Sequence, residues 1–99
     1  YNSVAVTTGA TADNTDTNTV TVTLKDANDN PVSGETVTLS ASATATVSSV
    51  TDNGDGTYTA TVTDTKAESV TITARHAGHT KTATMKFVAD SATIKDISG

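Results

Sequence analysis

The chain has 99 residues, a formal net charge of −5 and no cysteine. Its length allows one domain with a modest hydrophobic core, and that core has to form without disulfide bonds. The acidic residues are scattered, which argues against a nucleic-acid partner because such partners select basic patches. No apolar run approaches the roughly 20 residues of a transmembrane helix.

Threonine alternates with apolar residues along most of the chain, and a period of two is typical of β-strands. The alternation predicts seven strands, at residues 4–6, 19–25, 36–41, 46–50, 57–63, 69–75 and 80–88. The residues expected to face the core are Val20, Val22, Leu24, Val37, Leu39, Val47, Tyr58, Ala60, Val62, Val70, Ile72, Ala74, Ala83, Met85 and Phe87. Seven short strands separated by turn signals predict an all-β, immunoglobulin-like sandwich of two antiparallel sheets.

The segments between these strands carry turn residues. Residues 9–18 are polar and are expected to form a loop. Pro31 fixes its own φ angle, and Gly34, Gly54 and Gly56 can adopt the positive φ that tight reversals need. The sequence HAGH at 76–79 closes the last expected hairpin.

The end of the chain is expected to lie outside this sandwich. Residues 1–90 are assigned to one immunoglobulin-like domain, because the seven strands end before residue 90. Residues 91–99 contain a second β-like run, which we interpret as a linker and the first strand of a following repeat that is cut off. The chain is therefore expected to be one module of a string.

The stretch DANDNP is the first candidate site, because Asp26, Asn28, Asp29 and Asn30 are rich in oxygen ligands. It is similar to the calcium linker of cadherins. A calcium site needs acidic groups that converge from several loops, and this stretch lies between two strands of one domain. We expect a turn in which Asp and Asn side chains bond their own backbone, with calcium as the alternative.

Other candidate sites are weaker. The stretch DNGDGTY lacks the glutamate that an EF-hand loop needs at its twelfth position, where Thr63 stands. His76 and His79 have no third metal ligand nearby in sequence and are expected to be exposed turn residues. Lys25, Lys81 and Lys86 fall outside the expected core, which argues against an internal isopeptide bond.

Neither a catalytic site nor a cofactor is expected. No Gly-x-Ser-x-Gly elbow is present, and the acidic residues lie in loops with nothing to bury them, so ordinary titration is expected. Tyr58 is expected to place its ring in the core and its hydroxyl against a backbone group.

The order of these signals resembles the group 1 bacterial immunoglobulin-like domain of the intimin and invasin adhesins, the inverse autotransporters. The resemblance covers residues 3–90, and one departure is Glu68, where the family often has glycine. It is carried by Asp26, Asn30, Pro31, Val32, Gly34, Val37, Leu39, Asp55, Gly56, Tyr58, Thr65, Ala67, Val70, Ile72 and Ala74.

The resemblance implies an extracellular spacer on a bacterial surface, anchored in the outer membrane by another part of the parent chain. Its partners would be neighbouring immunoglobulin-like domains, and a distal domain would contact the host receptor. The alternative is a module that itself binds a host protein, a glycan, peptidoglycan or another adhesin copy, and weak self-association stays open. A large apolar or aromatic patch, which interfaces prefer, is missing from the sequence.

Overall fold

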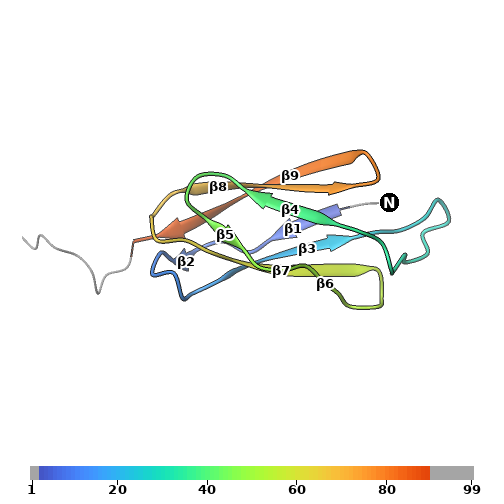
Figure 1. The fold of residues 1–99 in the computed structure, drawn as a ribbon, viewed down its shortest axis with the longest axis horizontal. Coiled ribbons are helices and arrows are strands. Elements are labelled where there is room, and N and C mark those ends of the chain that lie inside the picture. The colour runs from blue at the N-terminus through green and yellow to red at the C-terminus, as the bar shows by residue number, and fades with distance from the viewer. Residues whose placement is uncertain (1–2, 90–99) are drawn as a thin grey trace, which may run out of the picture.

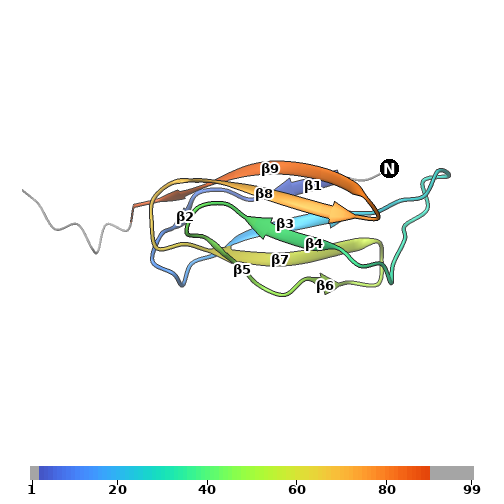
Figure 2. The same ribbon diagram turned by 45° about the horizontal axis from the view of Figure 1, so that its top comes forward.

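The computed structural model describes residues 3–89, and these residues form two packed β-sheets (Figure 1, Figure 2). One sheet has the order β1-β3-β7-β5, with β6 also paired to β7, and the other has the order β2-β9-β8-β4. The strands are β1 (Ser3–Val6), β2 (Ala10–Thr11), β3 (Asn18–Thr23), β4 (Thr38–Ala41), β5 (Thr46–Val47), β6 (Thr51–Asp52), β7 (Thr57–Thr63), β8 (Ser69–His76) and β9 (His79–Val88). The expected all-β, immunoglobulin-like sandwich is confirmed.

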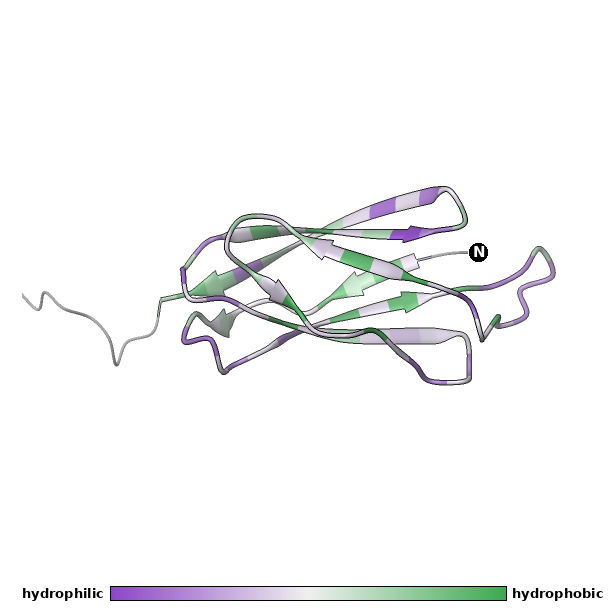
Figure 3. Cartoon of the chain, in the orientation of Figure 1, coloured by the Kyte–Doolittle hydropathy of each residue, from purple (hydrophilic) through white to green (hydrophobic). Residues whose placement is uncertain are grey.

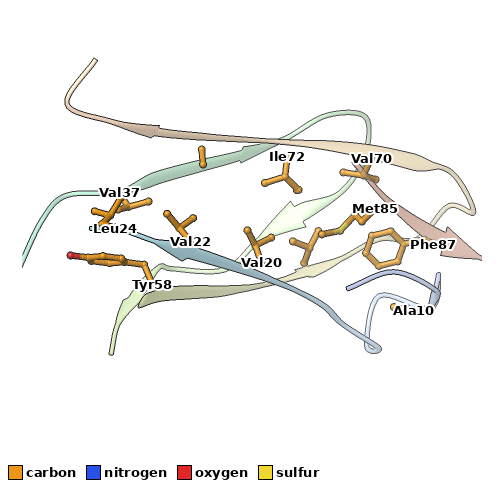
Figure 4. Packing of buried hydrophobic residues seen from close by; sticks show 12 residues of the cluster. Ala10, Val20, Val22, Leu24, Val37, Tyr58, Val70, Ile72, Met85 and Phe87 are labelled. Carbon is orange, nitrogen blue, oxygen red and sulfur yellow. The ribbon is translucent and has the colours of Figure 1, made fainter. Parts of the chain in front are cut away.

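The core lies between the two sheets, where every second side chain of the long strands points inward (Figure 4). Hydrophobic and hydrophilic residues accordingly alternate along the strands (Figure 3). In β3 and β7 the inward residues are in register, so that Val20 pairs with Ala60 and Val22 with Tyr58. Threonine takes most of the outward positions, because a β-branched residue with a hydroxyl suits the solvent face of a strand. The buried hydrophobic residues are Ala10, Val20, Val22, Leu24, Val37, Tyr58, Ala60, Val62, Val70, Ile72, Ala74, Met85 and Phe87.

The two ends of the sandwich carry different loops. The hairpin end holds the β8–β9 turn, the start of β1, the loop 24–37 and the β6–β7 turn (Figure 1). The exit end holds the last residue of β9, Val88, with the loop 12–17 and the turn 64–68. The chain therefore enters the described sandwich at one end and leaves it at the other.

Two short strands were missed by the sequence prediction. Residues 9–18 are not a continuous loop, because β2 pairs with the end of β9 and β3 already begins at Asn18. The expected strand 46–50 is split into β5 and β6, and β6 extends to Asp52, which had been assigned to a turn. Strands of two residues are too short to show a period of two in sequence.

Three further details differ from the prediction. The β2–β9 pair is parallel, so one sheet is not purely antiparallel. Strand β4 begins at Thr38 rather than at residue 36. Leu39, Val47 and Ala83 are only half-buried, although Leu39 and Val47 pack against the core. For Leu39 the reason is its place on β4, an edge strand that has only β8 as a neighbour.

Candidate functional site: turns and buried polar groups

The DANDNP stretch folds into a turn organised by Asp26. One carboxylate oxygen of Asp26 accepts hydrogen bonds from the backbone amides of Asn28 at 2.8 Å and Asn30 at 2.9 Å. The amides of Asn30 and Asn28 lower the pKa of Asp26, because they stabilise its ionised form. Asp29 adopts a φ of 66° and lies 3.4 Å from the ammonium of Lys25. The carboxylate oxygens of Asp26 thus accept hydrogen bonds from residues of its own turn.

Metal-ligand clusters are not formed by the described residues. Within residues 3–89, no group of three or more His, Cys, Asp or Glu side chains comes together in a way that could hold a metal ion. The four residues Asp26, Asn28, Asp29 and Asn30 form one turn at the hairpin end rather than a meeting point of several loops. The calcium alternative gains no support from this arrangement.

The glycines at the hairpin end allow two loops to pack closely. Gly56 has a φ of +88°, and a Cβ built on it would lie 2.6 Å from the Cβ of Pro31. The carbonyl of Gly56 also accepts a hydrogen bond from the amide of Leu24 at 2.8 Å. Gly54, with a φ of +77°, faces open space. Gly34 also has a φ of +77°, and its amide donates to Asp52 at 2.7 Å.

Tyr58 connects the core to the loop 24–37. Its side chain is buried, and its hydroxyl donates to the carbonyl of Val32 at 2.9 Å (Figure 4). The same hydroxyl accepts from the amide of Glu35 at 3.1 Å. The Tyr58 hydroxyl thereby helps to hold a long loop without strands of its own against the sandwich.

The two histidines of the β8–β9 turn differ from each other. His79 is exposed, but His76 is half-buried, and its Nε2 atom lies 2.8 Å from a carboxylate oxygen of Glu35. The expectation that both are exposed turn residues is therefore wrong for His76. The sequence could not reveal this contact, because Glu35 lies 41 positions away. The Nδ1 atom of His76 is buried and has no hydrogen-bond partner.

Asp64 is a buried acidic group at the exit end, with only 1% of its surface exposed. Its carboxylate accepts from the Thr44 hydroxyl at 2.7 Å and from the Lys66 amide at 3.0 Å, and its carbonyl accepts from the Asn14 amide. Burial opposes ionisation of Asp64, but hydrogen bonds with Glu68, Thr44 and the Lys66 amide hold its pKa below the ordinary value. Asp64 thus connects three loops.

The expectation of ordinary titration is wrong for several acidic residues. The pKa of Asp13 is lowered by the backbone amides of Asp16 and Thr15, and that of Asp55 by the hydroxyl and amide of Thr57. The pKa values of Asp26 and Asp64 are lowered as described above. Each of these carboxylates accepts hydrogen bonds within a turn, and these bonds stabilise its charged form.

Asn18 is the second buried polar residue that sequence reasoning missed. Its amide group donates to the carbonyl of Lys86 at 3.0 Å, and its carbonyl accepts from the amide of Ala10 at 3.3 Å and the hydroxyl of Thr7 at 3.4 Å. The sequence did contain a signal for this burial: Asn18 lies two residues before Val20, so it continues the inward face of β3. Asn18 joins the crossover from β1 to β2 to strand β9.

Glu68 occupies the β7–β8 turn without strain. Its backbone exchanges two hydrogen bonds with the backbone of Phe87, and its φ angle is not positive. Its carboxylate accepts from the backbone amide of Thr44 at 3.3 Å and lies 2.9 Å from the Thr44 hydroxyl, whose single proton it shares with Asp64. A glycine is therefore not needed at this position, and the turn keeps its place in the fold.

Comparison with known proteins decides the family. The model of the family described as "Invasin, domain 3" matches residues 2–90. The chain belongs to this family. No curated protein sequence matches the chain closely enough to count as a relative.

Solved structures of bacterial adhesins share the fold. Invasin, described as a bacterial integrin-binding protein, is 28% identical with a TM-score of 0.79 over 90% of this chain and 19% of its own. The D0-D1 domain of intimin is 28% identical with a TM-score of 0.74 over 90% of this chain and 50% of its own. The Escherichia coli adhesin FdeC is 33% identical with a TM-score of 0.71 over 89% of this chain and 31% of its own. The chain thus spans between about a fifth and a half of these three structures.

These matches support the sequence-based resemblance to the intimin and invasin domains. The chain is an immunoglobulin-like module of the adhesin type. The residues that the structure describes include no helix long and apolar enough to cross a membrane.

Proposed function

We propose that the chain is a non-catalytic spacer module in the extracellular stalk of a bacterial adhesin, where it projects a distal receptor-binding domain. The observation that carries this proposal is that the chain enters the sandwich at the hairpin end and leaves it at the exit end (Figure 1). Modules connected in this way add their lengths. A module with both connections at one end would instead fold the string back on itself.

The surface of the described residues supports a spacing role over a binding role. Val88 is the one large hydrophobic residue that is exposed among residues 3–89, and it lies at the chain exit, where a neighbouring module would be connected. Protein interfaces usually centre on aromatic and apolar side chains, whereas threonine dominates the outer faces here. A threonine-rich face keeps a long stalk soluble and offers little to a partner.

The proposed location is the bacterial cell surface, with the parent chain anchored in the outer membrane by a part outside this sequence. Residues 1–90 would form the module, and residues 91–99, which lie outside the described residues, would lead into the next repeat. The relatives support this placement. Invasin and FdeC are several times longer than one module, and the D0-D1 structure of intimin is about two modules long.

A substitution experiment separates a spacer from a binding module. In the parent adhesin, this module is replaced by an unrelated sandwich domain of equal length whose termini also lie at opposite ends. We expect cell adhesion to be retained, because length and stiffness are preserved. Loss of adhesion on this replacement, with the protein still displayed at the surface, would show that the module itself binds a host protein, a glycan, peptidoglycan or another adhesin copy.

A further inference from the structure

A small cavity opens between the two sheets at the hairpin end. Its volume is about 90 Å³, and none of its lining residues is acidic, although the chain carries a net charge of −5. The lining combines an apolar floor with a polar rim in which Arg75 and Lys81 are cationic. The floor is formed by Val4, Val22, Leu24, Val37 and Ala74, and the rim by Arg75, His76, His79, Thr80 and Lys81.

The register of β8 and β9 explains why the sandwich stays open here. Met85 and Phe87 are buried, so the alternation of β9 places Ala83 and then Lys81 on the same inward face. Lys81 pairs with the inward residue Ala74, so a lysine takes the place of a core residue at the hairpin end. Lys81 is exposed and lines the cavity, so it gives the cavity a cationic wall.

The charge at the mouth of the cavity comes from Lys81 and Arg75. His76 also lines the cavity, but its Nε2 atom is bonded to Glu35 and its Nδ1 atom is buried, so neither nitrogen is open to a partner. A carboxylate is the group that complements the lysine and the arginine.

An acidic loop lies beside the point where the chain leaves the module. The carbonyl of Val88 accepts a hydrogen bond at 2.8 Å from the amide of Ala12, the first residue of the loop 12–17. Asp13 and Asp16 in this loop are exposed, and backbone amides lower the pKa of Asp13, so that it stays charged. At the other end of the module, Val4 of β1 forms part of the cavity floor. In a string of such modules, the acidic loop and the cavity are thus both next to the connection.

We propose that the hairpin-end cavity is the docking site for the acidic loop, the counterpart of residues 12–17, on the preceding module of the same type. This inference rests on the proposed function, because it needs modules in tandem. The contact is head-to-tail, with different surfaces on the two partners, and therefore repeats along the stalk. A weak contact suffices, because a short flexible linker gives an effective concentration in the millimolar range.

A tandem of two complete copies of the chain tests this site. Only the second copy is isotope-labelled, and the amide chemical shifts of its residues 76–81 are compared with those of the single chain. We expect these shifts to differ in the tandem at low salt. Lys81→Gln in the second copy, or Asp13→Asn with Asp16→Asn in the first, should reduce the difference at least twofold, as should added salt.

The matched control is Lys86→Gln in the second copy, which removes the same charge from the same strand near the exit end. We expect this control to leave the shift difference intact. Shifts in the tandem that equal those of the single chain, or a difference that survives the variants of both copies, would overturn the docking site. Small-angle scattering on the same tandem separates the two proposals. An elongated, stiff particle with unchanged shifts overturns the docking site alone, whereas a freely jointed particle overturns the stiff spacer.

Discussion

The acidic turns of the hairpin end and the buried polar residues of the exit end make different kinds of polar contact. At the hairpin end, Asp26 bonds to amides two and four residues away, and Asp55 bonds to Thr57. At the exit end, the buried Asn18 bonds to a carbonyl 68 positions away, and the buried Asp64 bonds to a hydroxyl 20 positions away. Local bonds shape single turns, whereas the long-range bonds join separate strands and loops.

This difference has an energetic consequence. An exposed turn that loses a hydrogen bond can bond to water instead, so its net cost is small. A buried group that loses its partner keeps the full desolvation penalty, roughly 1–3 kcal/mol. Polar substitutions at the exit end should therefore destabilise the fold more than comparable substitutions in the acidic turns of the hairpin end. The first prediction below concerns backbone fit, which this ranking of polar substitutions does not cover. The later predictions test the ranking itself.

The largest effect is expected from Gly56→Ala at the hairpin end, where backbone fit rather than polar bonding is at stake. The positive φ strains an alanine by about 1–2 kcal/mol, and contact of its Cβ with Pro31 adds overpacking of about 1–3 kcal/mol. Urea denaturation should show a loss of about 2–5 kcal/mol in the free energy of unfolding. Gly54→Ala is the matched control, because it shares the positive φ but faces open space.

Equal losses for the two glycine variants would mean that only the φ angle matters and that the loops do not meet at Gly56. A larger loss for Gly56→Ala would show that the hairpin end depends on one long-range contact between the loop 24–37 and the β6–β7 turn. That contact is made by carbon atoms, so its loss would not test the ranking of polar contacts.

The second effect concerns Asn18→Ala at the exit end. The variant leaves the buried amide of Ala10 without a partner, whereas the carbonyl of Lys86 keeps the amide of Gly9. The expected loss is about 1–3 kcal/mol in the free energy of unfolding, measured by urea denaturation. Asn28→Ala makes the same change in an exposed turn of the hairpin end and should stay within about 0.5 kcal/mol of the parent. A reversed order would refute the proposed difference between the two ends.

A smaller effect is expected from Tyr58→Phe. The variant keeps the buried ring but removes the hydroxyl that bridges Val32 and Glu35. The expected loss is about 1 kcal/mol, since both partners are only partly buried and can reach water. Hydrogen exchange at the Glu35 amide should quicken in the variant. Unchanged exchange at this amide would mean that the loop 24–37 is held by other contacts.

The sequence allowed the long strands to be predicted because each has a buried and a solvated face. Val22, Ile72 and Phe87 lie on the buried faces, at 3%, 0% and 3% exposure. The Asp26 turn was also predictable, since its donors and acceptor lie within five residues of one another. These features depend only on alternation and on local bonding, and both can be recognised in one sequence.

The remaining features depend on which segments meet in space. Nothing local indicates that Glu35 lies beside His76, or that Thr44 donates to Asp64. The buried position of Asn18 follows from the alternation of β3, but its partners do not, because they lie on β2 and on the last strand. Pairing of the two-residue strand β2 with β9 is equally hidden.

The smallest effects should appear as pH dependence, in Asp26→Asn and Asp64→Asn. Both carboxylates have pKa values lowered by folding, so each contributes stability above the unfolded pKa of about 3.9 and loses it as pH falls through the folded pKa. The difference in unfolding free energy between parent and variant should therefore be largest near neutral pH and shrink below about pH 4. Urea denaturation at a series of pH values measures this difference.

The difference in unfolding free energy should be larger for Asp64→Asn than for Asp26→Asn, because Asp64 is buried and bonds to a distant loop. A difference that stays constant with pH would mean that the side chain acts through its shape and not through its charge.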